Sequence, residues 1–294
     1  MRVASNKLKD IIAFFYTELE SIYEAPEIEA MANLAVEHYL GFSPTEGEQK
    51  ANANVNQSDL LKLYDCAKAL KEHKPLQYIL GQAWFYNLKF NVSPAVLIPR
   101  PETEELVDMI LKENTPALCF LDIGTGSGCI PVTIKHKLPN AEVHACDISR
   151  EALLVAQQNA NLNNAAVTFF EADVLNIKIF ESLSGKKFDV IVSNPPYIKD
   201  SEKAAITKHV IDQEPHLALF VEGDDDIVFY KKIIDLAASK LNDKGRVYFE
   251  LNPLTALAVQ EYAIRSNLFA TAALIKDMSG KVRFFKGIKK QLTP

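Results

Sequence analysis

Hydrophobic positions divide the chain into regions of different periodicity. Up to residue 81 they recur at the spacing of amphipathic helices, as at Ile11, Phe15 and Leu19. A polar stretch follows at residues 52–57, and Ser58 is expected to cap a further apolar helix. The pattern predicts a small helical-bundle domain over residues 1–81.

The spacing changes to a period of two residues after this region. The alternating hydrophobic residues are Trp84, Tyr86, Leu88, Phe90 and Val92. Such alternation is typical of half-buried strands, and it predicts a β-hairpin whose turn lies at Asn87 or at residues 91–94. We interpret residues 82–100 as a hairpin linker between two domains.

Strand-like and helix-like segments alternate from residue 101 onward. The expected strands are residues 117–123, 142–147, 167–173, 188–194 and 246–251, and the expected helices include 149–162 and 226–241. Such alternation implies βαβ units and a mostly parallel sheet. Residues 271–276 and 282–285 flank a turn at Ser279-Gly280 and predict a final antiparallel hairpin. We therefore expect an α/β, Rossmann-type domain over residues 101–294, with the seven-stranded sheet of class I S-adenosylmethionine-dependent methyltransferases.

Composition and charge narrow the classes of partner. Lys and Arg number 32 against 38 Asp and Glu, which gives a formal net charge of −6. No basic run is longer than a pair such as Lys289-Lys290, which argues against a nucleic-acid-binding face. The apolar run at residues 11–16 is too short for a signal peptide or a membrane span. We expect a cytoplasmic protein that binds neither membranes nor nucleic acid directly.

The cysteines predict no metal site. They are Cys66, Cys119, Cys129 and Cys146. None of them forms a Cys-x-x-Cys pair, and we expect buried, reduced thiols.

A glycine-rich loop follows the first predicted strand of the α/β domain. Its residues are Gly124, Thr125, Gly126, Ser127 and Gly128. Glycines there let the backbone turn sharply and approach a ligand. The loop departs from the Gly-x-Gly-x-x-Gly pattern of pyrophosphate binding, which favours a cofactor without a diphosphate.

Two acidic residues end the next two predicted strands. Asp147 is placed to accept hydrogen bonds from ribose hydroxyls, because it lies about 20 residues beyond the glycine loop. The alternative is a cap for the following helix, a role that Ser149 can fill. Asp173 could accept a hydrogen bond from an adenine amino group, with Val174 covering the ring.

The fourth strand leads into Asn194-Pro195-Pro196-Tyr197, which predicts the reaction. An amide nitrogen is a poor nucleophile, because its lone pair is delocalised into the carbonyl. The Asn194 side-chain oxygen and the Pro195 carbonyl can each accept one N–H of a planar NH₂ group, while the two prolines hold the backbone rigid. Tyr197 can pack over that group and favour a nearby sulfonium. No dedicated general base is apparent, and His209 and His216 are candidates only by default.

These motifs resemble the release factor glutamine methyltransferases, the HemK/PrmC family. The resemblance extends over most of the chain and includes residues 76–81, 96–107, 121–130, 193–198, 214–219 and 276–283. It implies S-adenosylmethionine as methyl donor and the glutamine of the Gly-Gly-Gln motif of peptide chain release factors as acceptor. It also implies a monomer whose helical domain helps to hold the release factor. Residues 99–104 resemble part of the pocket wall, without individual roles.

Three other functions compete with this one. A nucleic-acid adenine methyltransferase uses a similar Asn/Asp-Pro-Pro-aromatic motif, but it would need a basic groove. A ribosomal-protein glutamine methyltransferase typically has Pro-Arg-Ser where this chain has Pro99-Arg100-Pro101. A non-catalytic scaffold would not be expected to keep the glycine loop, Asp147 and the Asn-Pro-Pro-Tyr motif together.

Overall fold

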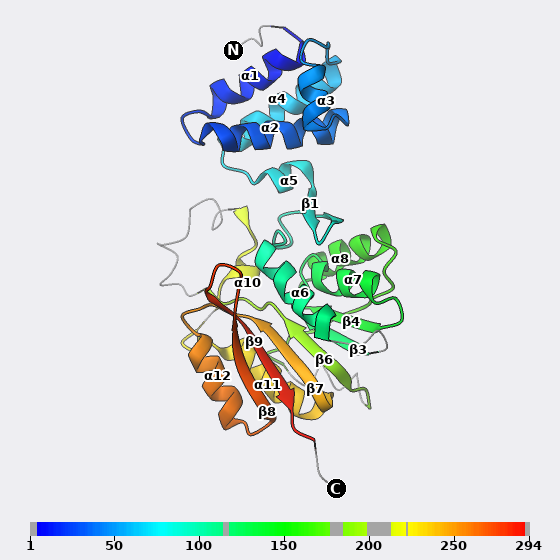
Figure 1. The fold of residues 1–294 in the computed structure, drawn as a ribbon, viewed down its shortest axis with the longest axis vertical. Helices are drawn as coiled ribbons and strands as arrows, with labels where there is room; N and C mark the ends of the chain where they lie inside the picture. The colour runs from blue at the N-terminus through cyan, green and yellow to red at the C-terminus, as the bar shows by residue number, and fades with distance from the viewer. Residues whose placement is uncertain (1–4, 114–117, 177–184, 199–212, 222, 292–294) are drawn as a thin grey trace. The chain divides into compact units, whose positions relative to one another are not determined.

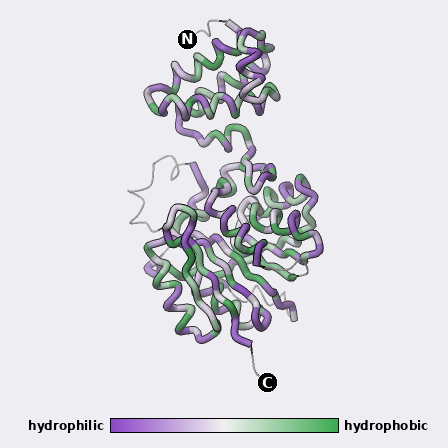
Figure 2. The backbone as a smooth tube through the Cα atoms, viewed as in Figure 1, coloured by the Kyte–Doolittle hydropathy of each residue, from purple (hydrophilic) through white to green (hydrophobic). Residues whose placement is uncertain are grey.

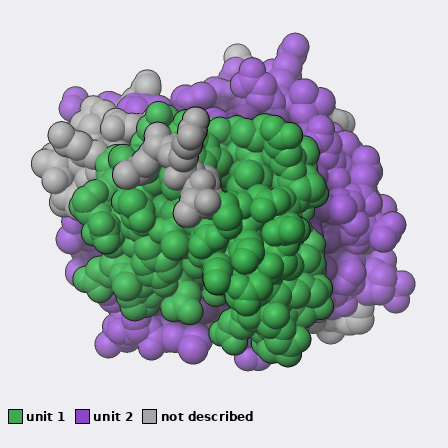
Figure 3. Space-filling model, turned by 90° about the horizontal axis from the view of Figure 1, so that it is seen from above, with its two compact units in different colours: residues 1–81 green, residues 82–294 purple. Residues whose placement is uncertain are grey.

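Two compact units make up the chain. The computed structural model describes residues 5–113, 118–176, 185–198, 213–221 and 223–291. Its contacts separate Met1–Gly81 from Gln82–Pro294, and the two units are distinguished in Figure 3. The hairpin that the sequence predicts over residues 82–100 falls within the second unit.

The first unit is built from amphipathic helices. They are α1 (Leu8–Leu19), α2 (Ala25–Leu40), α3 (Pro44–Gln49), α4 (Gln57–Lys71) and α5 (Leu76–Leu80). Hydrophobic and hydrophilic segments alternate along these helices (Figure 2), and the apolar faces of α1, α2 and α4 meet in one core. The expected cap at Ser58 is wrong, because the Asn56 side chain accepts the hydrogen bond from the Asp59 N–H at 2.9 Å and α4 starts at Gln57.

A tight hairpin opens the second unit. Strands β1 (Gln82–Phe85) and β2 (Leu88–Asn91) pair antiparallel, with Phe85 opposite Leu88. Tyr86 and Asn87 form the turn with φ of 50° and 61°, the left-handed pair that matches the twist of a two-residue hairpin. Of the two turn positions predicted from the sequence, the one at Asn87 is therefore correct.

The seven-stranded sheet confirms the predicted fold class. Its strands are β3 (Cys119–Ile123), β4 (Glu142–Asp147), β5 (Thr168–Glu171), β6 (Phe188–Ser193), β7 (Leu241–Glu250), β8 (Phe269–Lys276) and β9 (Val282–Lys289). They lie in the order β5-β4-β3-β6-β7-β9-β8. The first five of these pair in parallel, and β9 is antiparallel to both β7 and β8.

Helices cover both faces of this sheet (Figure 1). Helices α6 (Pro101–Glu113), α7 (Cys129–Lys137) and α8 (Arg150–Leu162) share one hydrophobic core with the hairpin. Helices α11 (Val228–Lys240) and α12 (Ala256–Arg265) share a second core on the other side, and α10 (His216–Leu219) is a single short turn. Among the described residues, no helix has both the length and the apolar character needed to cross a membrane.

Strand β7 begins earlier than the sequence pattern indicates. The pattern places its start at residue 246, whereas the strand starts at Leu241. Asp243 and Lys244 are exposed at this end, and Lys244 has a φ of 62°. The run of polar residues between Leu241 and Gly245 gives no alternating hydrophobic signal.

One buried side chain connects the hairpin, helix α8 and the glycine loop. Asn159 of α8 is completely buried. Its Oδ1 accepts from the Asn91 N–H at 2.6 Å, and its Nδ2 donates to the Asn91 and Ser127 carbonyls, each at 2.9 Å. Every polar atom of this amide is therefore used inside the unit.

We predict that Asn159→Ala lowers the free energy of unfolding by about 2–4 kcal/mol, because it leaves several buried backbone groups without partners. The matched control is Asn161→Ala, an exposed asparagine on the same helix, which should change stability by less than about 0.5 kcal/mol. Urea unfolding followed by circular dichroism measures both. Equal stability of the two variants would contradict the role assigned to Asn159.

Candidate active site

Parallel pairing brings three predicted motifs to one edge of the sheet. In the register of β3 with its neighbours, Ile123 lies opposite Cys146 of β4 and opposite Ser193 of β6. The glycine loop, Asp147 and Asn194 each begin one residue beyond these positions. Carboxyl ends of parallel strands are the place where α/β sheets bind ligands. The sheet therefore gathers there the residues that the sequence proposes for cofactor and acceptor.

The glycines of the loop have two different physical roles. Gly124, Gly126 and Gly128 all have positive φ, at 74°, 53° and 79°. A Cβ at Gly128 would lie 3.0 Å from the Ala156 Cβ, so this glycine allows α8 to pack closely. A Cβ at Gly124 or Gly126 would meet nothing within 4 Å. These two glycines therefore present bare backbone to open space.

Asp147 is half-buried and hydrogen-bonded to backbone. Its Oδ2 accepts from the Gly126 N–H and its Oδ1 accepts from the Ser149 N–H, both at 2.9 Å. Burial raises the pKa of this carboxyl, and the two N–H donors oppose the shift. Ser149 caps α8 by accepting from the Ala152 N–H at 3.1 Å. A carboxylate has about four acceptor positions, so these two bonds leave capacity for a ligand hydroxyl.

Asp173 and Val174 lie beyond β5 rather than at its end. The strand ends at Glu171, two residues before the end expected from the sequence. The Asp173 Oδ1 accepts from the Leu175 N–H at 2.8 Å, which forms a turn, and Val174 is buried. Because β5 pairs with β4, this turn follows the strand next to the one that carries Asp147.

A carboxyl that the sequence analysis missed lies directly before the glycine loop. Asp122 of β3 is only 1% exposed, and neither of its oxygens has a hydrogen-bond partner. Burial raises its pKa to about 7, and the nearby Thr125 side chain opposes that shift. An unpaired buried carboxyl is costly to keep. The sequence feature that could have revealed Asp122 is an acidic residue inside an otherwise apolar strand.

These features fit a ligand that carries an ammonium group and ribose hydroxyls. The orphaned Asp122 supplies an acceptor for the ammonium group, Asp147 supplies one for hydroxyls, and Gly124 and Gly126 leave space over the loop. S-adenosylmethionine has both kinds of group. The residues present are therefore suited to the cofactor that the sequence predicts.

Hydrogen bonds connect the Asn-Pro-Pro-Tyr motif to two other elements. The Asn194 Nδ2 donates to the Thr103 Oγ1 at 3.3 Å, and that hydroxyl donates to the Glu250 Oε2 at 2.7 Å. The Tyr197 hydroxyl donates to the Glu250 Oε1 at 3.3 Å. Pro195 is buried and Pro196 is half-buried. Thr103 belongs to the segment predicted as pocket wall, where no individual role was assigned, and Glu250 was not predicted from the sequence.

The Glu250 carboxyl lies in the protein interior. It is 1% exposed, and Thr103 is 2% exposed. Burial raises the pKa of Glu250, whereas the Thr103 hydroxyl and the charge of Arg283 lower it. The pKa of the Tyr197 hydroxyl is also raised, first by burial and then by the charge of Glu250.

An ion pair holds the segment before α6. The Arg100 guanidinium lies 2.5 Å from the Glu214 Oε1, and the Glu214 side chain is buried. Burial raises the pKa of Glu214, and Arg100 opposes that shift. His216 packs against the Phe220 ring with centroids 4.4 Å apart, whereas His209 lies outside the described residues.

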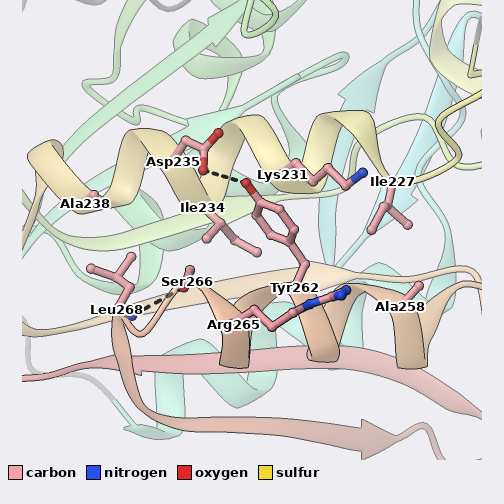
Figure 4. Close-up of a pocket in the computed structure, with 10 residues that line it drawn as sticks. All are labelled: Ile227, Lys231, Ile234, Asp235, Ala238, Ala258, Tyr262, Arg265, Ser266 and Leu268. Carbon is pink, nitrogen blue, oxygen red and sulfur yellow. Dashed lines mark hydrogen bonds between the residues drawn. The ribbon is translucent and has the colours of Figure 1, made fainter.

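Two further features lie apart from these residues. Cys119, Glu142 and His144 come close enough to share a cation. However, the Lys186 ammonium pairs with Glu142, and burial raises the pKa of the Cys119 thiol to about 12. A groove of about 660 Å³ lies between α11 and α12, where the Tyr262 hydroxyl donates to Asp235 at 2.8 Å (Figure 4). It includes none of the predicted site residues.

Several known proteins are similar to this chain. The family description "Methyltransferase small domain" matches residues 102–234. A release factor glutamine methyltransferase of Flavobacterium psychrophilum is 42% identical over 95% of this chain and 98% of its own length. One from Bacteroides thetaiotaomicron is 39% identical over 93% of this chain and 97% of its own. A solved methyltransferase structure from Pyrococcus furiosus has a TM-score of 0.51 at 21% identity, covering 81% of this chain and all (100%) of that one, which concerns the fold alone.

The buried Asp122 predicts a specific dependence of stability on pH. Its folded pKa, about 7, lies above the ordinary aspartate value of 3.8, so its protonated form is favoured by folding and the cost of ionising it grows as pH rises. Between about pH 5 and about pH 8 the wild type should lose about 2 kcal/mol more unfolding free energy than Asp122→Asn.

Urea unfolding of the ligand-free protein at the two pH values measures this difference. Asp243→Asn, which changes an exposed carboxyl, should retain the wild-type dependence. A parallel response of wild type and Asp122→Asn would show that Asp122 ionises normally in the folded protein.

Proposed function

This chain belongs to the release factor glutamine methyltransferase family, and we propose that it methylates the side-chain amide nitrogen (N5) of the glutamine in the Gly-Gly-Gln motif of peptide chain release factors. S-adenosylmethionine is the proposed donor, and the modification supports translation termination. The observation that carries the proposal is the pairing of β3 with β6, with Ile123 opposite Ser193. A glycine loop suited to the donor and a motif suited to an amide acceptor begin side by side.

The proposed cofactor residues surround the carboxyl ends of β3, β4 and β5. Residues 124–128 offer close backbone approach, Asp147 accepts from ribose hydroxyls, and Asp173 with Val174 holds the adenine. Asp122 accepts from the methionine ammonium group, which relieves the cost of its unpaired burial. When bound, S-adenosylmethionine supplies an electrophilic methyl carbon on a positively charged sulfur.

The proposed catalytic residues orient the acceptor. The Asn194 Oδ1 and the Pro195 carbonyl accept the two N–H groups of the glutamine amide. This fixes the NH₂ group and directs the face of its nitrogen at the methyl carbon. Tyr197, held by its bond to Glu250, packs over the planar amide. Most of the rate enhancement then comes from positioning rather than from a general base.

The helical unit and the net charge bear on the partner. We propose that residues 1–81 help to hold the release factor, while residues 101–294 carry catalysis. A net charge of −6 is unfavourable for direct nucleic-acid binding. The proposed enzyme acts in the cytoplasm as a monomer on a protein substrate.

Mass spectrometry of a bacterial release factor after incubation with the protein and S-adenosylmethionine tests this function. We expect one added methyl group on the Gly-Gly-Gln glutamine. A release factor with that glutamine changed to alanine is the control and should stay unmodified. If the intact release factor also stays unmodified although the protein binds S-adenosylmethionine, the acceptor is wrong, and a ribosomal protein and nucleic acid are tested next.

The role of Asn194 predicts a separation of binding from turnover. Asn194→Ala should lower kcat by about 100-fold or more, because the acceptor amide loses a fixed hydrogen-bond acceptor. Its affinity for S-adenosylmethionine, measured by isothermal titration calorimetry, should change little. An equal loss of cofactor affinity would assign Asn194 to cofactor binding instead. Asn161→Ala provides the control on a residue far from the motif in sequence.

A further inference from the structure

We propose that Thr103 and Glu250 act as positioning residues that fix which face of the Asn194 amide meets the substrate. The inference rests on the proposed function, because it concerns how Asn194 receives the acceptor amide. It assigns roles to a helix residue and a strand residue that are 147 positions apart in the sequence. Both are buried and hydrogen-bonded to the catalytic motif, and neither is assigned to touch cofactor or glutamine.

The single proton of the Thr103 hydroxyl determines the orientation of the Asn194 side-chain amide. A threonine hydroxyl has one proton to donate. Thr103 gives that proton to the Glu250 Oε2, at the short distance of 2.7 Å. Its oxygen can therefore only accept a hydrogen bond from Asn194, and only the NH₂ side of the amide can donate one, as the Nδ2 does at 3.3 Å. The Asn194 Oδ1 then points away from Thr103.

We call the chain of hydrogen bonds from Asn194 through Thr103 to Glu250 the relay. Several contacts hold Glu250 at its end. The Glu250 Oε1 accepts from the Tyr197 hydroxyl at 3.3 Å, and the Glu250 carbonyl accepts from the Tyr230 hydroxyl at 3.0 Å. Glu250 also pairs with Phe284 across the antiparallel β7–β9 ladder. One buried carboxylate thus fixes both ends of the Asn-Pro-Pro-Tyr motif, the asparagine through Thr103 and the tyrosine directly.

The reverse orientation of Asn194 would defeat the proposed reaction. With the amide turned over, its NH₂ group would face the NH₂ group of the glutamine, donor against donor. The acceptor would lose the hydrogen bond that holds its nitrogen in line. An amide without the relay has no comparable reason to prefer one orientation, so both would be populated and turnover would fall.

Thr103→Val tests the relay because it keeps the shape of the side chain and removes the hydroxyl. We expect kcat to fall about 10-fold or more, with KM for the release factor and affinity for S-adenosylmethionine nearly unchanged. Thr103→Ser, which keeps the hydroxyl, should recover most of the lost turnover. The matched control is Thr133→Val, because Thr133 is also fully buried on a helix and its hydroxyl has no hydrogen-bond partner among the described residues.

Two outcomes would overturn the inference. Turnover of Thr103→Val within about twofold of wild type would show that the hydroxyl does not matter to the reaction. Equal losses of turnover, cofactor affinity and melting temperature in Thr103→Val and Thr103→Ser would show that Thr103 only supports the fold.

A nitrogen–proton NMR spectrum tests the same geometry without a substrate. In the wild type the Asn194 side-chain NH₂ signals should exchange with solvent more slowly than those of the exposed Asn161, and Thr103→Val should remove that protection. Wild-type exchange as fast as that of Asn161 would overturn the relay. If the release factor is never methylated, the proposed function fails, and this NMR comparison alone decides the inference.

Discussion

The register between parallel strands β3, β4, β6 and β7 is the constraint on which the site depends. Side chains alternate between the two faces of a strand, so a slip by one residue would exchange the faces of an entire strand. Here both faces are buried, and residues such as Leu121 and Phe120 already belong to different cores. Each core therefore opposes a slip. The same register sets Ile123 opposite Ser193, from which the two loops of the site begin.

Polar groups inside this apolar framework fall into two kinds. Asn159 and the pair Thr103–Glu250 have their hydrogen bonds made within the protein, so they hold neighbouring elements in fixed positions. Asp122 is equally buried but has no partner. A buried group that is fully paired gives rigidity, whereas an unpaired one keeps binding capacity at a cost in stability. The site needs both kinds, and they lie at the same edge of one sheet.

Local patterns in the sequence were enough to predict the fold class and the motifs at strand ends. Strand alternation, the glycine loop and Asn-Pro-Pro-Tyr are each contained within a few residues. What could not be predicted depends on distant contacts. Glu250 ends a buried strand, and only the folded chain shows that Thr103 and Tyr197 meet it.

Short-range choices between similar residues were also difficult to predict. Asn56 and Ser58 are both good helix caps, and Asn56 is the one with extended backbone directly before the helix, where its side chain accepts from the Asp59 N–H. Asn242, Asp243 and Lys244 carry polar side chains near the start of β7, and Gly245 follows them, so this end of the strand has no alternating hydrophobic pattern. The cofactor, acceptor and partner roles proposed for individual residues rest on chemistry and resemblance, and they stay predictions.

The hairpin is attached to α8, so the segment that matches the family description and the compact structural unit begin at different residues. The family description begins at residue 102, after the hairpin. Yet Phe85 and Phe90 are buried in the same core as α6 and α7, and Asn91 satisfies the amide of Asn159. A fragment that begins at residue 102 would lack both aromatic rings, uncover the core side chains of α6 and α7 that they pack against, and leave the buried Asn159 amide without its Asn91 partners. The compact unit therefore starts at Gln82, about 20 residues before the family segment, so the limits of a homology segment need not coincide with those of a structural unit.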